Sequence, residues 1–360
     1  MNVLHIDEQV GWRGGEQQAS YLIQGLVRRG RRVVIAGRPN GLFLVSEHGG
    51  VPLVRIAAPF VTEFDPYTAL VLARAVRRHK IDILHAHTSH AHAAACLARR
   101  LAGRGKVVVS RRVDFAPRSG FINRWKYAMP DHIVAVSAAI ADVMREYGIP
   151  EERLTVVSSA TDPARFNVAP LVRQALGVPE GVPLLGNVAA LVGHKDHATL
   201  LSAMPLALAE LPELHLVIAG EGHLRSQVEA RIARLGIGSS VHLLGHRDDI
   251  PNLLRALDAF VLSSNQEGRG GAILEAMICE IPVVATAAGG LPELVMHEKT
   301  GLLSPVGDPH ALARNIVRVF REPALAREMA RNAASYVREN FCVDAMVEGN
   351  IRVYESLMAG

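Results

Sequence analysis

Residues 259–285 read AFVLSSNQEGRGGAILEAMICEIPVVA and contain one complete unit of the fold. The apolar runs 259–262 and 283–285 have the length and composition of buried strands, and a helix-forming segment separates them. A glycine-rich turn, residues 268–271, connects the first run to that helix. This order predicts a parallel β-α-β unit, and such sheets bind ligands at the carboxyl ends of their strands.

The same alternation of strand and helix covers nearly the whole chain. Strands are expected at 2–6, 32–36, 81–84, 106–110, 132–136, 154–157, 184–188, 215–219, 241–244, 259–262 and 283–285. Amphipathic helices are expected at 16–29, 66–79, 138–147, 309–320, 323–338 and 343–358. We therefore expect an α/β protein with two doubly wound, Rossmann-like domains facing a central cleft. The expected boundaries are 1–165, a linker at 166–182, and 183–340, with a final helix at about 341–360 completing the first domain.

Composition limits the class of protein. The 360 residues are 49% hydrophobic and 21% charged, which excludes a disordered or fibrous chain. The cysteines Cys96, Cys279 and Cys342 are too few and too scattered for a disulfide framework or a zinc motif. The sequence shows neither a signal peptide nor an apolar run of membrane-spanning length, so we expect a cytoplasmic protein. The formal charge of +4 combines a basic first half with an acidic second half.

Two carboxylates flank the glycine-rich turn. Glu267 lies in the loop, and Glu275 is expected in the first turn of the helix that follows. Glycines let a ligand approach the backbone, and N–H groups at a helix start favour phosphate. Glu275 could then hold a ribose, and Glu267 could reach the group that the phosphate carries. The alternative is a structural glycine turn followed by an ordinary helix-start glutamate.

With these residues the chain resembles the EX7E glycosyltransferases, the retaining GT-B enzymes of family 4 (glycosyl transferases group 1). Glu267 and Glu275 have the required spacing, and Ala276-Met277 and the apolar run 281–285 follow. Other segments occur in the family's order: Gly14-Gly15, Ala135-Val136-Ser137, Asp162-x-x-x-Phe166, Gly220-Glu221-Gly222 and Gly289-Gly290 with Glu293. The resemblance extends over essentially the whole chain.

The resemblance implies transfer of a sugar from a UDP-, GDP- or ADP-sugar to a hydroxyl of a glycan or lipid-linked acceptor, with retention. It suggests a role in bacterial envelope polysaccharide or lipopolysaccharide synthesis, with no cofactor and no metal. Glu267, His87 and Lys195 are the expected catalytic residues, and Lys195 also matches the diphosphate-binding lysine. The expected donor-binding residues are Gly14, Gly15, Lys195, Arg269, Gly270, Gly271, Ala272 and Glu275.

One departure from the family concerns phosphate binding. Ala190 occupies the position of the family's usual arginine. Either Lys195 and helix N–H groups suffice, or another arginine replaces the missing one. Arg269, within the glycine loop, is the first candidate, and Arg247 is the second.

Two further clusters lie in the first half. His85, His87, His90 and His92 surround the end of an expected strand, but no cysteine or acidic residue at ligand spacing supports a metal site. Backbone-capped histidines are the alternative. Arg118, Phe121, Arg124, Trp125 and Lys126 suit an interfacial helix on an anionic membrane, or a core helix with a basic face.

Other function classes remain open from the sequence. A sugar-nucleotide epimerase of the same architecture would turn over the donor alone, and a two-lobed binding protein would bind without turnover. No recognised nucleic-acid-binding motif is present, so no nucleic-acid partner is expected.

Overall fold

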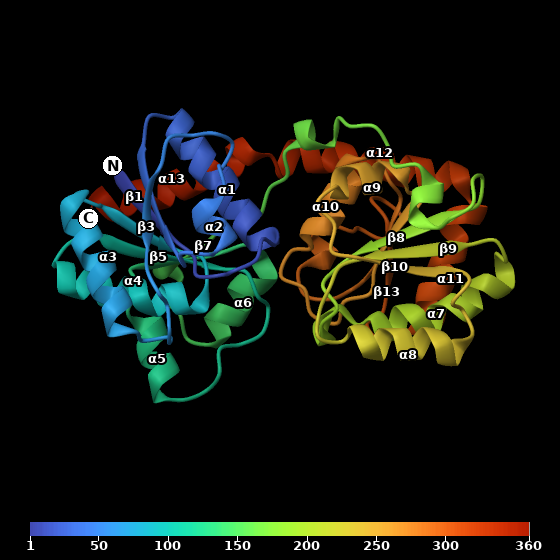
Figure 1. Cartoon of the computed structure of the whole chain (residues 1–360), viewed down its shortest axis with the longest axis horizontal. Coiled ribbons are helices and arrows are strands. Elements are labelled where there is room, and N and C mark those ends of the chain that lie inside the picture. Colours follow the sequence, from blue (N-terminus) through green and yellow to red (C-terminus); the bar gives the residue numbers. More distant parts are fainter. Residues whose placement is uncertain (360) are drawn as a thin grey trace. The chain divides into compact units, whose positions relative to one another are not determined.

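The computed structural model describes residues 1–359, and the chain forms two compact units (Figure 1). The N-terminal unit comprises Met1–Ala160 and Val343–Gly360, and the C-terminal unit comprises Thr161–Cys342. Residues 166–182, expected as a linker, pack on the C-terminal unit instead. Phe166, Leu176 and Val178 are buried in its core, so burial of these apolar side chains holds the segment in place.

The N-terminal unit contains a seven-stranded parallel sheet in the order β3-β2-β1-β4-β5-β6-β7. Its strands are β1 (Asn2–Ile6), β2 (Arg32–Gly37), β3 (Val54–Ala57), β4 (Ile83–Ala86), β5 (Lys106–Arg111), β6 (His132–Ala135) and β7 (Leu154–Val156). The strand order reverses between β1 and β4. In a doubly wound sheet such a switch point opens a crevice at the carboxyl ends of the two strands.

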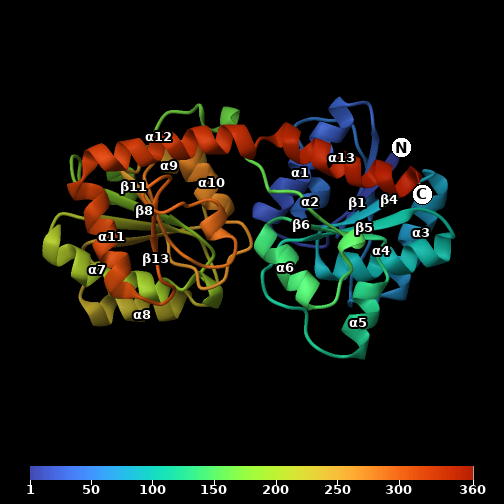
Figure 2. The same cartoon turned by 180° about the vertical axis from the view of Figure 1, so that it is seen from behind.

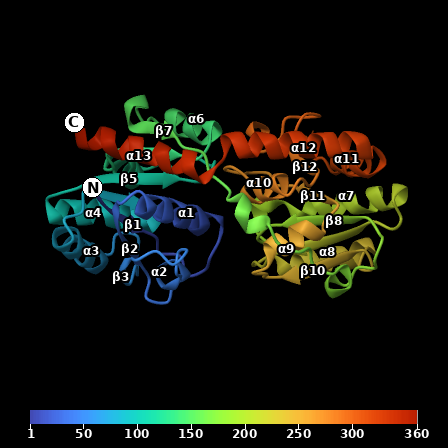
Figure 3. The same ribbon diagram turned by 90° about the horizontal axis from the view of Figure 1, so that it is seen from above.

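Helices cover both faces of this sheet. They are α1 (Gly14–Arg28), α2 (Leu42–Val45), α3 (Pro66–Arg78), α4 (Ser89–Ala102), α5 (Phe121–Ala128), α6 (Ala138–Glu146) and α13 (Val343–Ala359). The helix α13 packs on α1 over one face, and α3 and α4 pack together over the other (Figures 1 and 3). The last helix of the chain therefore completes the core of the first unit.

The C-terminal unit repeats the architecture with six parallel strands in the order β10-β9-β8-β11-β12-β13. They are β8 (Leu184–Val188), β9 (His215–Ala219), β10 (Val241–Gly245), β11 (Ala259–Leu262), β12 (Val283–Thr286) and β13 (Leu302–Ser304). The switch point of this sheet lies between β8 and β11. The glycine-rich turn quoted at the outset follows β11, so it lies at this switch point.

The helices of this unit are α7 (His197–Glu210), α8 (Arg225–Leu235), α9 (Ile250–Ala256), α10 (Gly271–Ile278), α11 (Pro309–Arg321) and α12 (Pro323–Asn340). One core joins α9, α10 and α12 to one face of the sheet, and another joins α7, α8 and α11 to the opposite face (Figures 1 and 2). Short 3-10 turns precede the sheet at Pro163–Phe166 and Arg173–Leu176 and follow β8 at Gly193–Lys195.

The strands differ from expectation in three places. The edge strands β3 and β13 were not expected, because each has only three or four residues and no long apolar run. The strand expected at 81–84 is shifted to Ile83–Ala86. The N–H of Ile81 bonds the carbonyl of Val76 at 2.9 Å, so Ile81 closes the turn after α3. As a result His85 lies on the strand itself.

Candidate functional site

At the switch point of the C-terminal unit, two loops bring Lys195 and Glu267 together. Lys195 ends the turn after β8, Glu267 lies in the loop after β11, and their side chains form an ion pair. The loops are also joined through the backbone: the Asn265 N–H donates to the His194 carbonyl at 2.9 Å. A cation and a carboxylate are thus held where such sheets bind ligands.

The start of α10, a few residues after Glu267, offers backbone donors that have no acceptor within the helix. Gly270, the N-cap, has φ of +74°, and a Cβ there would lie 2.5 Å from Leu291 Cδ2, so the position requires glycine. The N–H groups of Gly271 and Ala272 occupy the first helical turn, where no intrahelical acceptor exists. These N–H groups and the helix dipole favour an anion.

Glu275 lies on the same helix, one turn further along than expected. The helix begins at Gly271, so Glu275 falls in its second turn. Its carboxylate lies 3.4 Å from the guanidinium of Arg165. Burial raises the pKa of Glu275, and the charge of Arg165 opposes that shift.

The two arginines considered as replacements for the family's missing arginine are both engaged by carboxylates. Arg269 is buried, pairs with Glu293 at 2.8 Å and lies over the Phe341 ring at 5.3 Å. Arg247 pairs with Asp249 at 2.6 Å. Either charge would therefore be shared with a carboxylate if it served a phosphate.

At the switch point of the N-terminal unit, polar side chains follow three neighbouring strands. Asp7 follows β1, His87 follows β4 and Arg112 follows β5. The ends of β1 and β4 are joined by a bond from the His87 N–H to the Ile6 carbonyl at 3.0 Å. Gly15, at the start of α1, lies against this group, because a Cβ there would be 3.6 Å from Arg112 Cδ.

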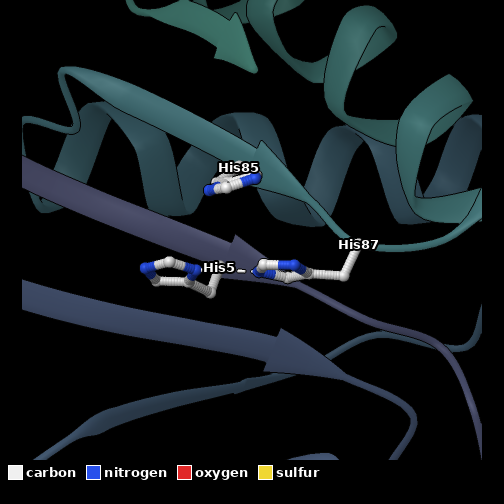
Figure 4. A group of neighbouring side chains, drawn as sticks. All are labelled: His5, His85 and His87. Carbon is white, nitrogen blue, oxygen red and sulfur yellow. Dashed lines mark hydrogen bonds between the residues drawn. The ribbon is translucent and has the colours of Figure 1, made fainter. Parts of the chain in front are cut away.

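The imidazole of His87 belongs to a buried cluster with His5 and His85 (Figure 4). His5 Nδ1 and His87 Nε2 are 2.9 Å apart, and their rings are nearly parallel at 9°. The nitrogens of His85 instead bond the hydroxyls of Tyr354, on α13, and Ser110. Burial lowers the pKa of His5 to about 3 and lowers those of His85 and His87 well below the ordinary range, so all three are neutral at pH 7.

The three imidazoles are close enough to be considered as metal ligands, since their nitrogens lie within 4.8 Å of one another. Most of these nitrogens are already engaged, and among the described residues only His5 Nε2 of the three rings is recorded as buried without a partner. A proton joins His5 to His87, and both nitrogens of His85 bond hydroxyl groups. Two imidazoles on one zinc ion at about 2.0–2.1 Å in tetrahedral geometry would lie further apart than the His5–His87 hydrogen bond. This arrangement is that of a hydrogen-bonded cluster.

The aromatic and basic segment around α5 is divided between surface and interior. Phe121 is 83% exposed and Ile122 64% exposed, and Arg118 and Arg124 are exposed beside them. Lys126, expected on the same basic surface, is instead buried, because it pairs with Glu63 and donates to Ser89 Oγ at 2.6 Å. Trp125 is partly covered by Arg100 and Phe64.

Sequence inspection missed His5, Asp7 and Arg112. His5 lies directly opposite His85 in the register of β1 and β4. Asp7 and Arg112 immediately follow the buried strands β1 and β5. A search for polar residues directly after each predicted parallel strand would have found Asp7, whereas Arg112 lies one residue further, because β5 extends to Arg111.

Two doubly wound units, each with polar residues at its switch point, match the GT-B fold of glycosyltransferases. Anabaena HepE, solved in complex with UDP and glucose, matches 100% of this chain and of its own at a TM-score of 0.85 and 25% identity. The N-acetyl-alpha-D-glucosaminyl L-malate synthase of Bacillus anthracis is 26% identical over 92% of this chain and 91% of its own. The lipopolysaccharide core biosynthesis glycosyltransferase LpsE of Rhizobium meliloti is 28% identical over 70% of this chain and 71% of its own.

The sequence model described as Glycosyltransferase Family 4 matches residues 12–165, and the one described as Glycosyl transferases group 1 matches residues 169–336. Together they cover most of both units. The chain belongs to the family 4 glycosyltransferases, as the EX7E pattern predicted.

Proposed function

We propose that the protein transfers a sugar from a uridine diphosphate sugar to a hydroxyl group, with retention of anomeric configuration. The observation that carries this proposal is the pairing of Lys195 with Glu267 beside the unpaired N–H groups of α10. A uridine nucleotide is favoured over other donors because HepE, matched over its full length, is described with UDP and with UDP-glucose.

In the proposed donor complex, the diphosphate lies on the C-terminal unit. Lys195 exchanges part of its contact with Glu267 for a phosphate oxygen, and the N–H groups of Gly271 and Ala272 donate to the same group. These donors would stabilise the negative charge that develops on the leaving diphosphate. Glu267, released from its partner, accepts hydrogen bonds from sugar hydroxyls, and Glu275 accepts them from the ribose.

Retention follows if the acceptor attacks the face of the sugar that the diphosphate leaves. The anomeric carbon loses its bond to the diphosphate oxygen and gains one to the acceptor oxygen, and the proton of the acceptor hydroxyl passes to the departing diphosphate, so no protein carboxylate needs to act as nucleophile. His87 and Gly15 of the N-terminal unit are the proposed contacts of the transferred sugar, with Gly14 beside them.

The acceptor is proposed to be a glycan or lipid-linked glycan of the bacterial envelope. LpsE, one of the relatives, is named for lipopolysaccharide core biosynthesis. The exposed Phe121 and Ile122, with Arg118 and Arg124, have the chemistry of a surface that rests on anionic lipid. Among the described residues no helix has the length and apolarity needed to cross a membrane. We propose peripheral attachment to the inner face of the cytoplasmic membrane.

The proposal is tested by a thermal-shift screen of UDP-, GDP- and ADP-sugars, followed by turnover of the stabilising donor. We expect a UDP-sugar to give the largest shift and the product's anomeric proton to show the donor's configuration by NMR. An inverted product would contradict retention, and conversion of the donor without acceptor would indicate an epimerase. Activity should survive excess EDTA, and a loss reversed by divalent metal would contradict metal-independent transfer.

A further inference from the structure

The carboxyl group of Asp7 is buried at the switch point of the N-terminal unit, and among the described residues only one of its two oxygens has a hydrogen-bond partner. Its side chain is 1% exposed. Oδ1 accepts from the Gln9 N–H at 2.9 Å, whereas Oδ2 has no hydrogen-bond partner within residues 1–359. A buried polar atom left unpaired costs about 1–3 kcal/mol, so it calls for a reason.

Arg112 presents the same feature on the neighbouring side of the crevice. Its Nε is buried and unpartnered among the described residues, although the residue as a whole is partly exposed. Arg112 and Asp7 are close enough for each charge to act on the pKa of the other. No ion pair within 4.0 Å joins them in the described part of the chain.

The same unit shows what a structurally satisfied aspartate looks like. Asp65, also buried, caps α3 by accepting from the N–H groups of Val61 and Tyr67 and from the Thr68 hydroxyl at 2.6 Å. These hydrogen bonds lower the pKa of Asp65. Burial instead raises the pKa of Asp7 to about 8, and the negative charges of Glu16 and Glu8 add to the shift.

The adjacent His87 has a defined protonation pattern. A guanidinium can only donate, so the long contact from Arg112 Nη2 to His87 Nδ1, at 3.5 Å, places the proton of His87 on Nε2. That proton is donated to His5 Nδ1 at 2.9 Å. His87 therefore adds no donor on the side that faces Arg112, and the guanidinium of Arg112 supplies the donors there.

The charge around this spot selects the kind of ligand. Glu8 accepts from the Ala91 N–H at 3.3 Å, and Glu16 accepts from the Arg13 N–H at 2.7 Å, so two further carboxylates flank Asp7. With one guanidinium against two carboxylates, a carboxylate or phosphate group would be repelled. A neutral hydroxyl can both accept from Arg112 and share a hydrogen bond with Asp7.

We infer that Asp7 and Arg112 form a subsite for a hydroxyl group of a neutral polyol or sugar, the part of the acceptor that receives the transferred sugar. This inference rests on the proposed function. An anionic portion of the acceptor would have to bind elsewhere on this unit, for example at the basic surface near Arg118 and Arg124. Asp7 then contacts the substrate, and its unpaired Oδ2 forms a hydrogen bond with the acceptor hydroxyl.

The first test measures UDP release from UDP-glucose with and without glycerol, which serves as a small stand-in for the polyol. Glycerol should increase the release several-fold in the wild type, and Asp7→Ala should reduce that increase about tenfold or more. The affinity for UDP should stay within about twofold in the variant. An equal increase in both proteins, or none in a wild type that binds UDP, would overturn the inference. Failure to bind any nucleoside diphosphate would instead count against the proposed function.

The second test uses stability to separate a ligand-binding role from a structural one. Asp7→Asn removes an ionisable group from a buried position, so at pH 8 the melting temperature should rise by about 2–4 °C. The matched variant Asp65→Asn should lower it, because that carboxylate is fully bonded. A fall in both variants would show that Asp7 is structural and would overturn the inference.

Discussion

The two switch points share a topology but differ in how their charges are held. In the C-terminal unit the cations are paired: Lys195 with Glu267, Arg269 with Glu293 and Arg165 with Glu275. In the N-terminal unit Asp7 and Arg112 form no ion pair within residues 1–359, each leaves one buried polar atom without a hydrogen-bond partner there, and the neighbouring His87 is neutral. A paired cation can exchange its carboxylate for a phosphate, whereas buried polar atoms without a partner can form hydrogen bonds with a hydroxyl.

Under the proposed function, the difference accounts for the binding of an anionic donor by the acidic half of the chain. Its net charge matters less than one lysine, one helix start and their geometry. In the basic half, the excess positive charge lies on the surface. The groups at its switch point are either neutral or outnumbered by nearby carboxylates. The predictions below contrast these two regions.

The largest expected effect is the response of the N-terminal unit to acid. His5 and His92 have pKa values lowered to about 3 by burial, and those of His85 and His87 are also lowered. The unfolded chain binds these protons near pH 6.5 and the folded chain does not. Stability is therefore complete above pH 6.5 and is lost below it, by about 2 kcal/mol at pH 5 for each of His5 and His92.

Tryptophan fluorescence measures this loss selectively, because Trp12 and Trp125 are the only tryptophans and both lie in the N-terminal unit. Its transition should precede that of far-UV circular dichroism as the pH falls. His92→Gln should move it to lower pH, and His90→Gln, on the same helix but partly exposed, should not. Coincident transitions would contradict the contrast between the units.

Next in size is the loss of Lys195. Lys195→Ala should reduce kcat/KM for the donor by about 100- to 1,000-fold, because it removes a cation that stabilises the leaving group. Steady-state kinetics measures this. The matched control is Lys299→Ala, which removes the other lysine of the C-terminal unit, an exposed one. Equal activity in the two variants would show that Lys195 does not belong to the donor site.

A smaller effect is expected for Glu275→Gln. Loss of a charged acceptor for the ribose hydroxyls costs about 1.5–3 kcal/mol, which corresponds to about 10- to 100-fold in donor KM. Glu280→Gln, just beyond the same helix and exposed, should leave KM unchanged. If Glu275→Gln lowers the melting temperature without raising KM, its role is the contact with Arg165 alone.

The smallest expected effect concerns the surface at α5. Arg118→Ser with Arg124→Ser should weaken binding to phosphatidylglycerol vesicles by about 30-fold, at ~1 kcal/mol per charge. Arg327→Ser with Arg331→Ser, exposed on α12, is the matched control. Co-sedimentation measures both, and equal binding by the two double variants would exclude the α5 surface as the attachment site.

Most of the fold was predictable, because apolar runs such as 184–188 and 215–219 are buried on both faces and bounded by turns. The edge strands β3 and β13 were not, since an edge strand of three or four residues needs no continuous apolar run. The C-terminal site was predictable because Glu267, the glycines and Glu275 are close in sequence. In the N-terminal unit His87 and Gly15 were expected but Asp7 and Arg112 were not, because these two and His87 follow three different strands that only the sheet order makes neighbours.

The direction of individual side chains also could not be predicted from the sequence. Lys126 and Arg269 both belong to polar segments that suggest exposure to solvent. Both side chains are buried instead, because Lys126 pairs with Glu63 and Arg269 pairs with Glu293. Each glutamate is distant in the sequence from the residue it pairs with, so no local sequence pattern predicts the ion pair. Phe121, by contrast, is exposed, although its apolar aromatic side chain alone would suggest a buried position.

The central claim, that the C-terminal switch point binds the donor and the N-terminal one binds the acceptor hydroxyl, is tested most directly by calorimetric titration of UDP. The wild type, Lys195→Ala and Asp7→Ala should be compared under the same conditions. We predict that Lys195→Ala weakens UDP binding about tenfold or more and that Asp7→Ala leaves it within about twofold. Equal weakening by both variants, or weakening by Asp7→Ala alone, would contradict this division.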